Sequence, residues 1–280
     1  METGLLFTMP AHKTKGHKSS LNLSIHVYMN GLSFFTYDVK THHTSKVYRK
    51  LFKQHIPVEK LHEHVHAELK AQDLIGQPFN KIRCSVENNL ATLVPKSLFE
   101  EASLHEYVQK DIDIRTNDFV TYDIFPSADW VNVYVPFVNV NNMLIDAFGS
   151  FTYFHAVSVW LNALTKHTVA DGKLVWSLYI EHHHLHIVLL RDKKLQFYNC
   201  FEATSPKDIA YYTLLTAEKN NISPNEVPLY LVGNCIEDDP TYSELFTFVR
   251  SINFLTPENE ALSSSPMLNA HQDFCLLNLY

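Results

Sequence analysis

Hydrophobic and polar residues alternate over residues 21–27, with the two-residue period of a strand that buries one face. The dipeptide Asn30-Gly31 follows, and it predicts a hairpin because both residues tolerate a positive φ angle. Residues 32–39 and 46–52 are rich in aromatic and β-branched side chains and predict two further strands. Apolar residues at helical spacing over residues 58–69 then predict an amphipathic helix.

Short strands and helices are predicted from there to residue 170. Ser97 is the expected N-cap of a helix over residues 98–110, because Glu100 lies three residues on, as in a capping box. The other elements predicted in this part are strands over 81–95, 119–125 and 130–137 and helices over 141–148 and 156–165.

A second series of elements starts after Asp171-Gly172. Ser205-Pro206 begins a helix that extends to Asn220, since proline at the first helical position loses no hydrogen bond. The other elements predicted here are strands over 173–181, 185–191, 195–201 and 228–233 and a helix over 241–252.

The order strand, strand, strand, helix, strand, helix thus occurs twice, from residue 21 and from residue 173. This order predicts an α/β fold in which antiparallel strands are extended by parallel ones, with helices on the faces of mixed sheets. We therefore expect a flexible tail over residues 1–20, an N-terminal lobe over 21–170, a C-terminal lobe over 171–260, and a linker and docking segment over 261–280. Apolar residues 274–279 are expected to add an edge strand to their own domain or to dock on a partner.

Composition narrows the range of functions. Hydrophobic residues make up 46% and charged residues 19% of the 280-residue chain, which is typical of a globular core. A net charge of −7 argues against a nucleic-acid binder, because such proteins need clustered Lys and Arg. The 7 glycines lie far apart, so neither a dinucleotide-binding nor a P-loop glycine motif occurs.

Cysteine spacing and hydropathy predict a cytoplasmic protein. The 4 cysteines form no C-x-x-C pair and are expected to be reduced. No secretory signal is recognisable at the N-terminus. The longest apolar region, residues 143–164, is interrupted by Asp146, His155 and Asn162, so we expect no membrane span.

Four stretches of the chain match features of a known superfamily. Leu231-Val232-Gly233-Asn234 is similar to a strand-end L-V-G-G, and residues 25–36 and 178–190 occupy the places of two phosphate hairpins. Residues 120–164 are similar to an extra subdomain of its pilus-assembly and cell-division members. The chain thus resembles the actin-like ATPases, which implies two ribonuclease-H-like lobes in an actin-like ATPase arrangement.

A closer resemblance rests on segments spread over most of the chain. These segments are residues 30–34, 91–99, 197–201 and Tyr211-Tyr212. By them the chain resembles an uncharacterised bacterial domain-of-unknown-function family (number 3822), which has no established activity. This second resemblance therefore implies a fold and no reaction.

The chain departs from the actin-like motifs where ATP and magnesium would bind. In active members each phosphate hairpin carries D-x-G, whose acid holds Mg²⁺ through water and whose glycine exposes backbone N–H groups. The first hairpin here keeps Gly31 but has no acid at its turn, and the second, residues 179–184, has three histidines and no glycine. Asn234 replaces the glycine that approaches adenosine. We expect a remnant nucleotide cleft formed by Asn30, Gly31, Ser33, Gly233 and Asn234.

Two histidine clusters have the spacing of metal ligands. His62-Glu63-His64-Val65-His66 matches the H-E-x-x-H of zinc proteases, but no further histidine motif follows it. His182, His184 and His186 would share one face if they lay on a strand, whereas in a turn they would be solvated. We expect no metal site and no catalytic residues.

These observations predict a cytoplasmic bacterial protein with a degenerate actin-like ATPase fold. We expect a non-catalytic binding or scaffolding module without a cofactor, which acts on a protein partner and not on nucleic acid. Tyr211, Tyr212, Tyr242 and Phe246 are candidates for an exposed binding surface. The alternative is an actin-like protein that binds or hydrolyses ATP with magnesium.

Overall fold

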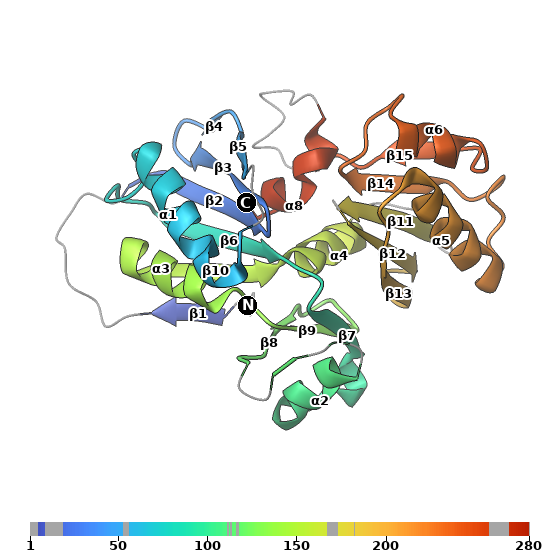
Figure 1. Ribbon diagram of the computed structural model, residues 1–280, viewed down its shortest axis with the longest axis horizontal. Helices are drawn as coiled ribbons and strands as arrows, with labels where there is room; N and C mark the ends of the chain where they lie inside the picture. Colours follow the sequence, from blue (N-terminus) through green and yellow to red (C-terminus); the bar gives the residue numbers. More distant parts are fainter. Residues whose placement is uncertain are drawn as a thin grey trace. The chain divides into compact units, whose positions relative to one another are not determined.

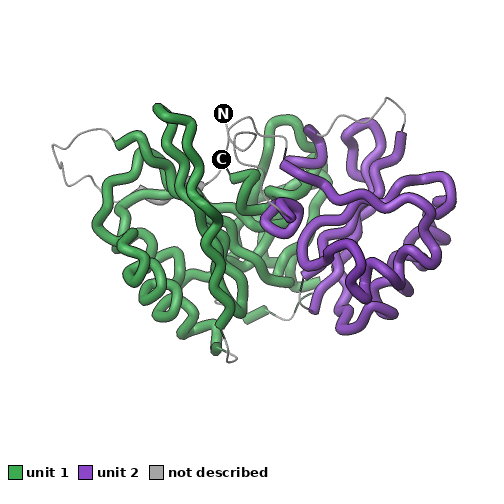
Figure 2. The backbone as a smooth tube through the Cα atoms, turned by 90° about the horizontal axis from the view of Figure 1, so that it is seen from above, with its two compact units in different colours: residues 1–161, 259–266, 275–280 green, residues 162–258, 267–274 purple. Residues whose placement is uncertain are grey.

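The computed structural model describes residues 5–8, 19–52, 56–110, 112, 114–115, 118–166, 173–181, 183–257 and 269–279. The chain forms two compact units (Figure 2). Unit 1 consists of residues 1–161, 259–266 and 275–280, and unit 2 of residues 162–258 and 267–274.

The main sheet of unit 1 has the strand order β1-β10-β6-β2-β3-β4, and β5 also pairs with β3 (Figure 1). These strands are β1 (Leu5–Thr8), β2 (Leu21–Tyr28), β3 (Gly31–Asp38), β4 (His43–Thr44), β5 (Tyr48–Leu51), β6 (Lys81–Glu87) and β10 (Ser150–His155). β6 is parallel to both β2 and β10, whereas β3 is antiparallel to β2. The predicted hairpin and the mixed sheet are therefore present.

Two helices cover one face of this sheet. α1 (Leu61–Ala71) follows the short 3₁₀ helix η1 (Val58–Lys60), and α3 (Val138–Phe148) packs beside α1. Their apolar stripes share one core with alternate residues of β2 and β6. This is the face that the alternation over residues 21–27 assigns to the interior.

A small three-stranded sheet, ordered β7-β9-β8, is inserted between β6 and α3. Its elements are β7 (Ala91–Pro95), η2 (Lys96–Leu98), η3 (Glu101–Ser103), α2 (Leu104–Gln109), β8 (Thr121–Ile124) and β9 (Trp130–Tyr134). The prediction of one continuous helix over residues 98–110 is wrong. The Tyr107 hydroxyl donates to the Leu98 carbonyl and accepts from the Glu100 N–H, which holds the chain extended between the two short helices.

Unit 2 contains one five-stranded sheet in the order β13-β12-β11-β14-β15. Its elements are α4 (Ala156–Lys166, which begins in unit 1), β11 (Leu174–Glu181), β12 (His184–Arg191), β13 (Lys194–Glu202), α5 (Pro206–Lys219), β14 (Leu229–Gly233), α6 (Pro240–Phe246), β15 (Ile252–Phe254) and η4 (Ala270–Asp273). α5 and α6 pack on one face around Trp176, Leu178 and Leu231. The order of the three antiparallel and two parallel strands is the same as in the main sheet of unit 1.

The prediction of a helix over residues 241–252 is wrong for the second half of this range. α6 ends at Phe246, and Ile252–Phe254 instead pair with β14 as the parallel edge strand β15. The Leu229 N–H donates to the Ser251 carbonyl at 2.9 Å, which joins the start of this strand to its neighbour.

The two ends of the chain differ from the expectation. Within the tail expected at residues 1–20, Leu5–Thr8 form β1, because they pair antiparallel with the open edge of β10. Residues 274–277 form the short helix α8 and not an edge strand, and Arg83 donates to the Leu279 carbonyl at 2.7 Å. The lobe boundary expected at residues 170 and 171 and the linker over 261–266 lie outside the described residues.

Candidate functional site

The first predicted site segment is the β2–β3 hairpin of unit 1. A Cβ atom at Gly31 would lie 2.3 Å from the Lys50 carbonyl oxygen and 2.7 Å from the Tyr28 ring. The Asn30 carbonyl accepts from the Phe52 N–H at 2.7 Å. Gly31 is therefore required because β5 approaches the turn closely, a reason independent of any phosphate.

Ser33 lies two residues inside β3 and is only 2% exposed. Its position in the sheet is opposite His26 of β2. The structure thus brings Asn30, Gly31 and Ser33 together on one hairpin, with Ser33 buried in the sheet and not at the turn.

A buried polar group, which sequence reasoning missed, lies on the neighbouring strands. His26 Nδ1 lies 2.7 Å from Ser85 Oγ, and His26 Nε2 lies 3.0 Å from Glu87 Oε2. His26 and Ser85 are paired residues of the parallel strands β2 and β6, and Glu87 lies two residues farther along β6 on the same face. An ionised carboxylate only accepts hydrogen bonds, so Nε2 carries a proton and donates to Glu87. The imidazole can then relay a proton between a hydroxyl and a carboxylate.

His155 extends this group at the carboxyl end of β10. Its Nδ1 accepts from the Val157 N–H at 3.2 Å, so Nε2 carries the proton and donates to the Asn88 carbonyl at 3.1 Å. Burial is the main reason that the pKa of His155 is lowered to about 4, which keeps the ring neutral. His155 therefore joins the chain after β6 to the start of α4 without adding charge.

Asp123 of β8 lies beside the same strand end. Its carboxylate accepts from the His155 N–H at 2.8 Å and from the Tyr134 hydroxyl at 3.0 Å. Burial raises the pKa of Asp123 to about 7, and the hydrogen bonds from Ser158, the His155 N–H and Tyr134 oppose this increase. The inserted sheet thus presents a buried carboxyl group to the carboxyl end of the main sheet.

The second predicted site segment is the carboxyl end of β14 in unit 2. Gly233 has a φ angle of +89°, and a Cβ atom there would lie 2.2 Å from the Ile180 carbonyl oxygen. That oxygen accepts from the Asn234 N–H at 2.7 Å, and Asn234 Nδ2 donates to Glu181 Oε2 at 3.3 Å. Gly233 and Asn234 therefore lie together at one strand end, where backbone pairing with β11 requires the glycine.

The histidine clusters lie on different kinds of element. His62 and His66 lie on α1 beside its buried stripe, with Glu63 exposed. Among the described residues, no group of three or more His, Cys, Asp or Glu side chains is arranged to hold a metal ion. His182 lies outside the described residues, whereas His184 and His186 lie on one face of β12.

The fold places the protein in a known structural class. It is similar to a crystal structure from Bacteroides thetaiotaomicron VPI-5482 described as a protein with actin-like ATPase fold and unknown function. The TM-score is 0.77 at 17% identity, over 89% of this chain and 97% of that one. A PilM–PilN type IV pilus biogenesis complex is also similar, with a TM-score of 0.57 at 13% identity over 92% of this chain and 97% of that one. The chain therefore has an actin-like ATPase fold, as its sequence predicts.

The family follows from the sequence itself. The family described as protein of unknown function (DUF3822) matches residues 10–252, and the chain belongs to it. No curated protein matches the sequence. In the described part of the chain, no helix is long and apolar enough to cross a membrane.

Proposed function

We propose that this protein is a non-catalytic binding module of the bacterial cytoplasm, in which an actin-like fold is kept without ATP hydrolysis. The observation that supports this proposal is the packing role of Gly31 and Gly233, the two glycines that the chain shares with the actin-like nucleotide-binding motifs. Gly31 makes room for the Lys50 carbonyl and Gly233 for the Ile180 carbonyl, so each glycine serves strand packing. Neither position needs a nucleotide to explain why it is glycine.

The polar groups at the strand ends are likewise engaged within the fold. Glu87 Oε2 is paired with His26 at 3.0 Å, and Asn234 is bonded to Glu181. A carboxylate that binds hydrated Mg²⁺ must turn its oxygens toward the ion's water shell. Pairing with His26 competes with that role, which supports binding without hydrolysis.

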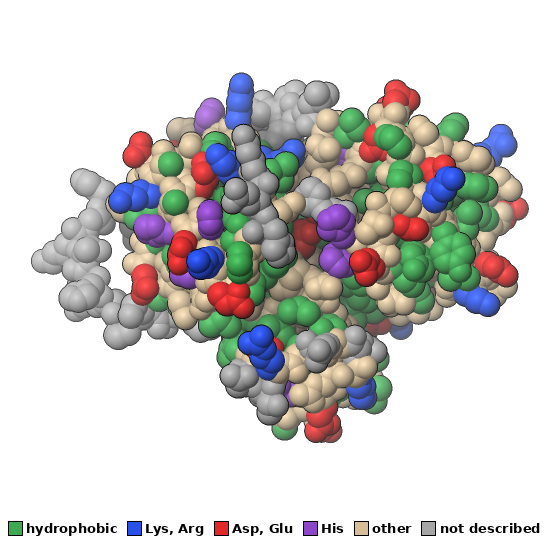
Figure 3. Space-filling view, in the orientation of Figure 1, with side chains coloured by type: hydrophobic (Ala, Val, Ile, Leu, Met, Phe, Trp, Pro, Cys, Tyr) green, Lys and Arg blue, Asp and Glu red, His purple; other side chains and the backbone are tan. Residues whose placement is uncertain are grey.

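A protein partner is proposed from the surface of unit 2. α5 and α6 pack side by side, and Tyr211 on α5 and Phe246 on α6 are 60% and 57% exposed. Figure 3 shows hydrophobic side chains on the face of unit 2 that carries these helices. Exposed aromatic side chains are enriched at protein interfaces. The similar PilM structure is a complex with PilN, which supports a protein ligand for this fold.

A second candidate, an ATP-binding protein, is favoured by the position of Glu87. This residue pairs in the sheet with Tyr28, the last residue of β2 before the first hairpin. A carboxylate on β6 therefore lies one strand away from the β2–β3 turn, which lacks the acid that active actin-like ATPases have there. If the hydrogen bond between His26 and Glu87 broke, Glu87 would be the residue to hold hydrated Mg²⁺.

A thermal-shift titration with millimolar ATP, with and without Mg²⁺, separates the two candidates. For a binding module we expect no saturable, magnesium-dependent stabilisation. Stabilisation above about 1 kcal/mol that is lost in Glu87→Gln would instead establish the ATP-binding candidate. The same protein serves as bait in a pull-down from its native host. Tyr211→Ser with Phe246→Ser should lose the partner, whereas Leu98→Ser, at another exposed apolar residue, should keep it.

A further inference from the structure

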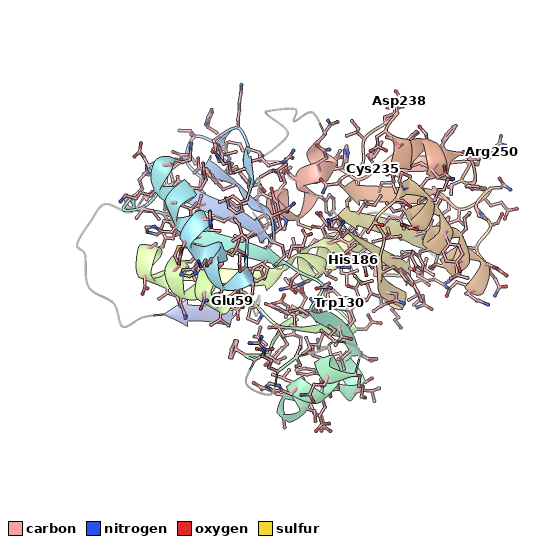
Figure 4. The ribbon with its side chains drawn as sticks, in the orientation of Figure 1. Glu59, Trp130, His186, Cys235, Asp238 and Arg250 are labelled. Carbon is pink, nitrogen blue, oxygen red and sulfur yellow. The ribbon has the colours of Figure 1, made fainter. Side chains whose placement is uncertain are left out.

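A cysteine and a histidine face each other on the sheet of unit 2, on the face opposite α5 and α6. His186 of β12 and Cys200 of β13 are paired residues of antiparallel strands. Cys200 Sγ lies 3.9 Å from His186 Nε2, within the range of a hydrogen bond to sulfur. Figure 4 shows His186 on its strand in this unit.

The histidine ring is held in place from two sides. Its Nδ1 lies 3.0 Å from the Tyr198 hydroxyl, which belongs to the same edge strand as Cys200. The Tyr179 ring of β11 stacks on it, with ring centroids 5.6 Å apart and an angle of 25°. Burial, followed by the nearby Cys200, raises the pKa of Tyr198 well above its usual value, so the phenol stays protonated. In the tautomer whose Nδ1–H donates to the Tyr198 hydroxyl oxygen, Nε2 is unprotonated and can accept the thiol proton of Cys200.

Cys200 differs from the other three cysteines in its surroundings. Cys84, Cys235 and Cys275 are 0%, 1% and 3% exposed, and burial raises the pKa of the Cys84 and Cys235 thiols. Cys200 lies on the edge strand and is partly exposed. A nucleophilic thiol needs both access and a neighbouring base that is itself oriented.

We propose that Cys200 is a reactive thiol, with His186 as its base and Tyr198 as the residue that positions the base, and that it exchanges with disulfides of small thiols. His186 Nε2 takes the proton from Cys200, and the thiolate attacks one sulfur of a disulfide R–S–S–R. A Cys200–S–S–R bond forms as the other S–S bond breaks. The leaving thiolate R–S⁻ takes the proton from His186, so the products are a mixed disulfide and a free thiol.

The test is the rate at which the folded protein reacts with the aromatic disulfide 5,5′-dithiobis(2-nitrobenzoate) at pH 7. We expect one fast thiol, identified as Cys200 by mass spectrometry of the adduct and absent in Cys200→Ser. His186→Gln should slow this reaction about tenfold, because an unassisted thiol is only a few per cent ionised at pH 7. Tyr198→Phe keeps the ring but removes the partner of Nδ1, and it should slow the reaction by a smaller factor.

His184→Gln is the matched control, since His184 lies two residues away on the same face of β12. It should change the rate less than twofold, and the melting temperature of each variant shows whether it is folded. The proposal is overturned if Cys200 reacts no faster than a cysteine in an unstructured peptide. It is also overturned if His184→Gln slows the reaction as much as His186→Gln. Should His186→Gln fail to fold, an unchanged rate in folded Tyr198→Phe refutes the proposal.

Discussion

Asp123 is expected to make the stability of the protein depend on pH near neutrality. Asp123 is 1% exposed, and its neighbour His155 is neutral, so this imidazole does not compensate the charge of the carboxylate. Burial raises the pKa of Asp123 from 3.8 to about 7 in the folded state. The folded protein therefore holds this proton over a pH range in which the unfolded chain has released it.

The magnitude follows from the difference between the two pKa values. Below about pH 4, Asp123 is protonated in both states and has no effect on the free energy of unfolding. Between about pH 4 and pH 7, each pH unit lowers that free energy by about 1.4 kcal/mol, because only the unfolded state loses the proton. Above pH 7 Asp123 is ionised in the folded state as well, and the loss of unfolding free energy levels off at about 4 kcal/mol.

Asp123→Asn removes this titration while keeping the shape of the side chain. The amide oxygen can still accept from the His155 N–H, and the amide N–H₂ group can donate to the Tyr134 hydroxyl. Urea unfolding at pH 5, 6, 7 and 8 measures the stability of both proteins. The natural protein should lose about 1.4 kcal/mol per pH unit relative to the variant between pH 5 and 7.

A control and a direct titration complete the experiment. Glu106→Gln, at an exposed carboxylate on α2, should leave the pH dependence unchanged. The ¹³C resonance of the Asp123 carboxyl group should titrate with a midpoint near pH 7. A stability difference between the natural protein and Asp123→Asn that is constant from pH 5 to 8 would refute the reasoning.

Two further predictions concern packing. Gly233→Ala should lower the free energy of unfolding by about 3 kcal/mol, because the new Cβ meets the Ile180 carbonyl and φ is +89°. Gly76→Ala, at a φ of +87° with nothing within 4 Å, should cost only about 1 kcal/mol in the same urea experiment. Deletion of residues 267–280 should lower the melting temperature by several degrees, since each of the buried side chains contributes about 1.5–3 kcal/mol. These side chains are Phe274, Leu276, Leu277 and Leu279. A truncated protein that keeps its melting temperature but loses its partner would instead assign the segment to binding.

The sequence by itself determined the local elements and their order. The β2–β3 hairpin lies at Asn30-Gly31, and α5 begins at the predicted Pro206, after the N-cap Ser205, whose side chain accepts from the Asp208 N–H. These features depend on neighbouring residues: a turn dipeptide, a cap and the period of the apolar positions. The repeated order predicted an α/β fold with mixed sheets, and the resemblance of several motifs to the actin-like ATPases implied the fold that the structural comparison confirms.

Only the tertiary structure decided which polar residues meet. Alternation shows that His26 and Ser85 lie on polar faces of their strands, but not that β6 pairs in parallel with β2. That pairing brings together residues 59 positions apart, and the inserted sheet brings Asp123 to His155 in a similar way. The tertiary structure also gives Gly31 a packing role against β5, where the sequence suggested a contact with phosphate. The physical reason is that strand neighbours and register are set by how whole sheets pack, and this information is not contained in any one segment.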